Sequence, residues 1–197
     1  MTYVEVRPTS TAAGLALLER YREATRQEDG NLRSEVLQRI GQPHQLAILE
    51  VWNGQTAFET HAMGVNATDV RGKLEAIRNA PADERVHLGL SVGPIESAAP
   101  RDAIYVVAHV DVIPPRKDDG AAALERLADQ SRKGDGNLRF EVVRQTNRPN
   151  HFTVVEIWKN VRAVEAHSMA PATREFRDTL APLTGALYDE RMYRAVD

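Results

Sequence analysis

The chain has 197 residues, of which 42% are hydrophobic and 27% charged, a mixture typical of a globular protein. Its formal net charge is −3 and no block of Lys or Arg forms a basic stripe, which argues against nucleic acid or an anionic membrane as a partner. It has no cysteine, which excludes disulfides, thiolate nucleophiles and Cys-based metal sites. The first residues lack the pattern of a secretory signal, and no apolar run approaches the roughly 20 residues of a membrane helix, so we expect a cytoplasmic protein.

The hydrophobic patterns predict the same order of elements in both halves: strand, helix, strand, strand, helix, strand. In the first half these elements are expected at residues 3–6, 11–27, 31–39, 45–52, 58–77 and 84–92. In the second half they are expected at residues 103–113, 117–134, 137–145, 152–158, 160–183 (interrupted by a proline) and 188–196. This order is the ferredoxin-like pattern, so the sequence predicts an α+β fold.

The two halves repeat one another. Gly30, Trp52 and His61 recur 106 positions later as Gly136, Trp158 and His167, and the offset holds without a gap over most of each half. A period of this length is a whole domain and indicates a duplication. We therefore predict a first domain at residues 1–93, a linker at 94–101 that is rich in Pro and Ala, and a second domain at 102–197.

A four-stranded antiparallel sheet with helices on one face leaves its other face uncovered. Two copies in one chain can cover both open faces by packing them on each other. The sequence thus predicts two tandem ferredoxin-like domains that form an intramolecular α/β barrel. Because the pairing is already present within one chain, we expect a monomer or a weak homodimer.

The second half contains, in order, NLRFEV, a proline, E-x-W, EAH, FRDTLAPL and YDERMY, between Ile104 and Val196. This pattern resembles the antibiotic biosynthesis monooxygenase domain of the dimeric α/β-barrel superfamily. The first half keeps its polar and aromatic positions, namely Asn31, Arg33, Glu35, Pro43, Glu50, Trp52 and His61. The resemblance implies that the chain is a covalently joined version of the pair that single-domain members form.

In each half a Trp ends the third strand and a His follows on the next helix. From the residues alone, the Trp is either a core aromatic or a pocket wall whose N–H donates to a substrate oxygen. A lone His is more often structural, although imidazole is the side chain best suited to take a proton near neutral pH. The resemblance implies that both face a pocket. The candidate catalytic residues are therefore His167, Trp158, His61 and Trp52.

Candidate substrate-binding residues are mostly aromatic and belong mostly to the second half. They are Phe176, Tyr188 and Tyr193, together with the first-strand residues His109 and Tyr3. Aromatic walls suit flat aromatic substrates, so the second half is the expected working half. Strand alternation predicts that Leu138, Phe140 and Val142 face the helices. On the same argument Arg139 and Glu156, with Arg33 and Glu50 in the first half, could form ion pairs in the barrel interior.

The sequence contains no metal-ligand spacing, no dinucleotide-binding glycine loop and no nucleophile elbow, so we expect no metal and no cofactor. The resemblance implies a cofactor-independent monooxygenase acting on a small aromatic, quinol or polyketide-like molecule with O₂. The family's oxygenases carry an Asn four residues before the Trp, whereas this chain has Ile48 and Val154 there. A non-catalytic small-molecule binder is therefore the alternative, and an isomerase or haem-degrading relative a lesser one.

Overall fold

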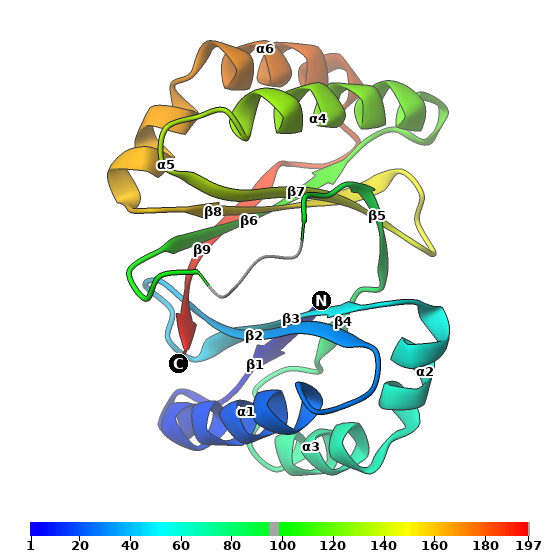
Figure 1. Cartoon of the computed structure of the whole chain (residues 1–197), viewed down its shortest axis with the longest axis vertical. Helices are drawn as coiled ribbons and strands as arrows, with labels where there is room; N and C mark the ends of the chain where they lie inside the picture. Colours follow the sequence, from blue (N-terminus) through cyan, green and yellow to red (C-terminus); the bar gives the residue numbers. More distant parts are fainter. Residues whose placement is uncertain (95–98, 197) are drawn as a thin grey trace. The chain divides into compact units, whose positions relative to one another are not determined.

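The computed structural model describes residues 1–94 and 99–196 and divides the chain into two compact units. Unit 1 comprises Met1–Arg85 and the last residues of the chain from Arg194 onward. Unit 2 comprises Val86–Tyr193. Within each unit, helices cover one face of an antiparallel sheet (Figure 1).

Unit 1 has the predicted ferredoxin-like order of elements. Its sheet runs β4-β1-β3-β2, with the end of β9 beside β2. The elements are β1 (Thr2–Glu5), α1 (Thr11–Thr25), β2 (Asn31–Arg39), β3 (Gln45–Trp52), α2 (Gln55–Met63), α3 (Val65–Glu75) and β4 (Asp83–Glu84).

Unit 2 repeats this architecture with a longer closing strand. Its sheet runs β9-β6-β8-β7-β5. The elements are β5 (His87–Ser91), β6 (Ile104–Asp111), α4 (Lys117–Ser131), β7 (Asn137–Gln145), β8 (His151–Trp158), α5 (Val161–Ser168), α6 (Pro171–Leu180) and β9 (Asp189–Val196). The predicted α+β class and tandem ferredoxin-like units are confirmed.

A glycine in a left-handed conformation ends the loop after the first helix of each unit. Gly30 and Gly136 have φ angles of 82° and 80°, a region that side chains rarely adopt. Their carbonyl groups accept hydrogen bonds from the backbone N–H groups of Asn53 and Lys159, just beyond the Trp-bearing strand. The repeated glycine therefore holds the end of the first helix against the end of the third strand, where the Trp lies.

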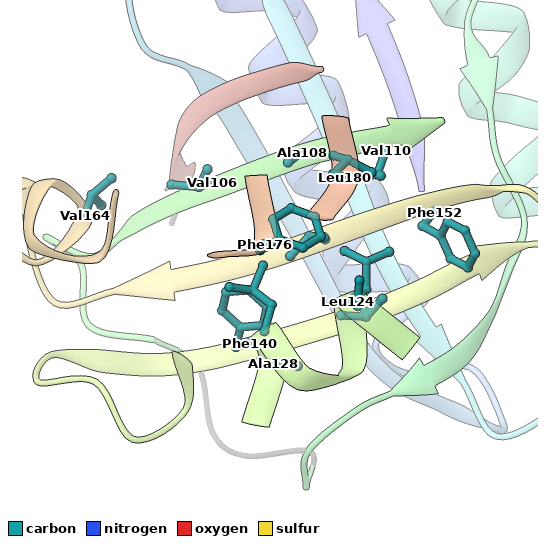
Figure 2. Packing of buried hydrophobic residues seen from close by; sticks show 14 of the residues in the cluster. Val106, Ala108, Val110, Leu124, Ala128, Phe140, Phe152, Val164, Phe176 and Leu180 are labelled. Atoms are coloured by element: carbon teal, nitrogen blue, oxygen red, sulfur yellow. The ribbon is translucent and has the colours of Figure 1, made fainter. Parts of the chain in front are cut away.

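The core of unit 2 lies between the sheet and the helices (Figure 2). Alternate residues of β6, such as Val106 and Ala108, meet Phe140 of β7 and Phe152 of β8. Leu124 of α4 and Phe176 of α6 cover them from the helix layer. Burial of these apolar side chains is the main stabilising term of the unit, at roughly 25 cal/mol for each Å² removed from water.

Two details of the predicted strand faces are wrong. Leu138 is 39% exposed, because the ladder between β7 and β8 shifts register between Asn137 and Arg139 and the bulge turns its side chain out of the core. Phe140 and Val142 do face the helices.

The second correction concerns Glu156. It alternates in phase with Val154 and Trp158, so it lies on the helix side of the sheet rather than opposite it. The predicted ion pair with Arg139 does not form. Arg139 instead lies 3.5 Å from Glu141 on its own strand.

The compact units do not follow the two sequence repeats to their ends. β5 closes the first repeat, yet it pairs with β7 in the sheet of unit 2, and the end of β9 joins unit 1. The predicted boundary at residue 93 therefore differs from the boundary of the compact units at Arg85. Residues 95–98 of the predicted linker lie outside the described residues. The packing of the two open sheet faces on each other stays a prediction.

Candidate functional site

In unit 2 the predicted Trp and His form one stacked pair. The rings of Trp158 and His167 have centroids 4.6 Å apart and an interplanar angle of 26°. Trp158 comes from the end of β8 and His167 from the last turn of α5, so the short β8–α5 connection brings the two rings together. Phe140 meets the His167 ring edge-on at 5.7 Å.

Glu156 joins this pair from inside the core. The indole N–H of Trp158 donates to its Oε2 atom at 2.7 Å, and Nε2 of His167 lies 3.5 Å from the same oxygen. The Trp158 N–H is therefore bonded to Glu156 and not to the pocket. Because Nε2 faces Glu156, the other ring nitrogen of His167, Nδ1, faces Thr173, whose Oγ1 is 3.4 Å away.

A pocket of about 450 Å³ opens beside the Trp158–His167 pair. Half of the lining residues have small side chains, and Trp158 and His167 are the aromatic residues among them. Gln130, Asp135, Lys159, Asn160 and Arg162 supply polar groups. The remaining lining residues are Ser131, Gly134, Ala163, Ala166, Ala170, Ala172 and Thr173.

Burial sets the protonation of the two titratable groups at the pair. It lowers the pKa of His167 to about 4, with the Arg177 guanidinium adding to the shift, so the imidazole is neutral at pH 7. It raises the pKa of Glu156 to about 8, because burial outweighs the opposing hydrogen bond from Trp158. Both groups are thus uncharged at neutral pH.

These shifts predict how stability depends on pH. The folded protein keeps a proton on Glu156 that the unfolded chain releases above its ordinary value of 4.5, so stability is lost as pH rises toward 8. The lowered pKa of His167 makes stability increase as pH rises, but only below pH 6.5, where the unfolded chain would protonate this His. Of these two groups only Glu156 contributes between pH 6.5 and 8, with a slope of up to about 1.4 kcal/mol per pH unit, and the comparison with a Glu156 variant removes the contributions of all other groups.

Glu156→Gln should remove this slope, since an amide mimics the protonated carboxyl and still accepts from Trp158. We expect the free energy of unfolding of the wild type, relative to Glu156→Gln, to fall by about 2 kcal/mol between pH 6.5 and 8. Urea unfolding at a series of pH values measures it. Parallel curves for the two proteins would contradict a buried, protonated Glu156.

Unit 1 contains the equivalent pair in a different environment. Trp52 and His61 have ring centroids 4.5 Å apart. Nδ1 of His61 donates to the Glu28 carboxylate at 2.7 Å, and Nε2 lies 2.8 Å from the Tyr21 hydroxyl. Tyr21 donates to Glu50 at 2.7 Å. Both ring nitrogens of this His therefore contact side chains of the protein itself.

Two substitutions between the repeats explain this difference. At the position equivalent to Glu28, unit 2 has Gly134. At the position equivalent to Tyr21, it has Leu127. Without a tyrosine hydroxyl, Glu156 accepts from Trp158 instead, whereas the buried Nε1 of Trp52 has no hydrogen-bond partner. Without a glutamate, His167 Nδ1 has the Thr173 hydroxyl beside it at 3.4 Å, and Gly134 and Thr173 both line the pocket.

The other predicted site residues lie away from this pocket. Phe176 is in the core and lines a separate groove with residues of α4. His109 bonds Thr153, and Tyr193 pairs with Tyr105; both lie on the face of the sheet that points away from the helices. Tyr3, in unit 1, donates to the sulfur of Met1.

Tyr188 lies near Glu156. The residue is 42% exposed, but its hydroxyl is buried. Burial of that hydroxyl, and then the nearby carboxyls of Glu156 and Glu190, raises its pKa well above the ordinary value. Tyr188 is therefore part of the polar surroundings of Glu156 and does not line the pocket.

The described part of the chain contains no helix long and apolar enough to cross a membrane. Among the same residues, no three His, Asp or Glu side chains gather in a way that could hold a metal ion.

The fold and the paired Trp–His sites define a tandem α+β protein with one such pair in each ferredoxin-like unit. The chain belongs to the antibiotic biosynthesis monooxygenase family, whose model matches residues 1–65 and 103–179, in both halves.

Solved structures share the fold over the whole chain. A proposed monooxygenase from Lactobacillus acidophilus is 14% identical with a TM-score of 0.80, covering 98% of this chain and 91% of that one. A second, from Fusobacterium nucleatum, is 14% identical with a TM-score of 0.82, covering 100% and 90%. An anthrone oxidase-like protein is 17% identical with a TM-score of 0.71, also covering 100% and 90%. These similarities show the fold alone.

A curated relative, an uncharacterized protein of Synechocystis sp., is 23% identical over 96 residues. The match covers 49% of this chain and 65% of that relative, so the chain spans less than two thirds of the relative's length.

Proposed function

We propose that the chain is a monooxygenase that oxidises a small phenolic or quinol-like aromatic molecule with O₂, and that the reaction takes place in the pocket of unit 2. Family membership supports the class of reaction. The observation that carries the choice of site is the open pocket bounded by the stacked Trp158 and His167 rings. The equivalent His in unit 1 is bonded to Glu28 and Tyr21.

In this proposal His167 is the base. A substrate hydroxyl at Nδ1 gives its proton to the neutral imidazole, and the resulting imidazolium lies between the substrate oxyanion and Glu156. Trp158 fixes both groups, since its ring stacks on His167 and its N–H holds Glu156. Low local polarity keeps the developing anion reactive toward O₂.

The oxidation itself uses electrons from the substrate. The substrate anion passes one electron to O₂, and the substrate radical and superoxide join through a new C–O bond. Loss of water from the resulting hydroperoxide leaves a carbonyl group. A CH₂ group and O₂ thereby become C=O and H₂O, so the substrate supplies all four electrons.

The base strength of His167 restricts the substrate. A simple phenol titrates near 10, as tyrosine does, whereas the pKa of His167 is about 4. Proton transfer across roughly six units costs about 8 kcal/mol before any stabilisation of the anion. Substrates with an acidic hydroxyl or enol are therefore favoured. Ionisation of Glu156, 3.5 Å from Nε2, strengthens the base further.

One observation favours the alternative of a non-catalytic binder. Val154, four residues before Trp158 on the same strand face, is 1% exposed in the apolar core and supplies no polar group to a substrate. In that case the pocket binds an aromatic molecule without oxidising it.

Oxygen consumption separates the two functions. We would follow O₂ uptake by the purified protein with a panel of anthrones, quinols and naphthols, with calorimetric binding measured in parallel. The oxygenase should consume one O₂ for each molecule converted and release a quinone without accumulating hydrogen peroxide. A panel member that binds in the pocket but causes no O₂ uptake would instead establish a binding protein.

A further inference from the structure

Unit 1 contains a carboxylate at the position where the pocket of unit 2 is open. The Glu28 carboxylate accepts from His61 Nδ1 at 2.7 Å through one oxygen and from the Asn66 amide at 3.0 Å through the other. Asn66 also donates to Thr25 on α1, so the carboxylate is held between the first helix and α3. This half of the duplicated scaffold therefore shows which group fits against the stacked His.

In unit 2 the residues that supply and hold this carboxylate are replaced by smaller ones, whereas the stacked Trp and His are retained. Gly134 and Ala172 stand where unit 1 has Glu28 and Asn66, and both line the pocket. His167 still stacks on its Trp, and Nδ1 is on the side of Thr173, another lining residue. The site has lost its internal anion and kept the ring nitrogen that bonded it.

The mouth of the pocket carries positive charge only in unit 2. Arg162 and Lys159 line it, whereas the equivalent residues of unit 1 are Thr56 and Asn53. Lys159 is paired with Asp135, at 2.9 and 3.0 Å from its two oxygens. Within the part of the chain that the structure describes, Arg162 makes no side-chain hydrogen bond or ion pair, so its charge is available to attract an anion.

We propose that the pocket of unit 2 binds its aromatic ligand as an oxyanion, with the charged oxygen against His167 Nδ1 at the place that the Glu28 carboxylate fills in unit 1. The ligand class is thus an aromatic carboxylate or an acidic hydroxyaromatic molecule, and each chain binds one ligand. Unit 1 is the same site closed by its own side chain. This proposal rests on the pocket of the proposed function and names the chemical form of its ligand.

The test uses benzoate and its uncharged counterpart benzamide as probes, in calorimetric titrations without O₂. The wild type should bind one benzoate per chain, at least about 10-fold more tightly than benzamide, because a charge-assisted hydrogen bond is lost in the amide. Gly134→Glu should weaken benzoate binding at least 10-fold, since the new carboxylate takes its place. Tyr21→Leu with Glu28→Gly should open the second site and raise the stoichiometry to two.

Equal affinities for benzoate and benzamide, or no binding of either, would overturn the proposal. Unchanged benzoate binding in Gly134→Glu would also overturn the proposal. This measurement tests the proposal even if the double variant of unit 1 does not fold. A folded double variant that still binds a single benzoate would refute the claim about unit 1. Since no turnover is needed, benzoate binding by a protein that consumes no O₂ would leave this proposal standing while the oxygenase function fails.

Discussion

Replacing His167 with alanine should lower turnover about 10²–10⁴-fold, the usual loss when a general base is removed. The neutral imidazole is the group that faces the pocket and can accept the substrate proton. Trp158 and Glu156 remain bonded to each other, so the fold should persist. Oxygen-uptake kinetics with the best substrate of the panel measure the loss. Added imidazole should restore part of the rate by entering the space left by the side chain.

His61→Ala is the matched control in unit 1. His61 is as buried as a core residue, and both its ring nitrogens bond to protein side chains. Its removal should therefore reduce stability and affect turnover far less. Equal losses in the two variants would contradict a single working pocket. Unchanged turnover in His167→Ala would remove His167 as the base.

The fold was largely predictable because the same pattern of strands and helices occurs twice in the sequence. Strand alternation and glycine positions recur in both halves, so Gly30 and Gly136 mark the same left-handed turn twice. The bulge at Leu138 was not predictable, since a local shift in register leaves the alternation of the sequence intact. The same holds for β5, because a strand has the same pattern whichever sheet edge it joins.

The candidate site was predictable in part. The fixed spacing of Trp and His around a strand end indicated that the two side chains meet, and they do so in both units. Glu156 was assigned to the wrong face, although its place two residues before Trp158 put both on one face. An acidic residue on the core side runs against the usual preference of cores for apolar groups, and burial raises its pKa.

The residues that open or close the site were missed, because they lie outside the repeated motif. Glu28 and Gly134 follow the first helix, more than twenty residues before the Trp, and only the tertiary contact brings them beside the His. A signal did exist in the sequence. At a constant offset, Gly opposite Glu and Leu opposite Tyr both place a smaller side chain in the second half. Such paired reductions in size indicate a cavity in one copy of a duplicated fold.

Gly134→Glu should lower turnover about 10²-fold or more by giving unit 2 the closed arrangement of unit 1. The new carboxylate would bond His167 Nδ1 as Glu28 bonds His61, and it would displace the substrate from the base. A displacement of a substrate by only about 1 Å can already lower the rate about 10²-fold. The backbone accepts a side chain, because Gly134 is not left-handed and makes the same turn as Glu28, with N–H donors to Ser131 at 2.9 Å and Thr25 at 3.1 Å.

Gly134→Ala separates loss of space from loss of the glycine itself. A Cβ atom at this position would lie 3.0 Å from the Ser131 carbonyl oxygen and 3.5 Å from the Trp158 ring, so a small local shift accommodates it. This variant should keep most of the pocket and most of the turnover, measured by the same oxygen-uptake assay with circular dichroism as the folding control. Glu28→Gln, in unit 1, should leave turnover unchanged. Full activity in a folded Gly134→Glu protein would show that the substrate reacts somewhere other than the pocket beside His167.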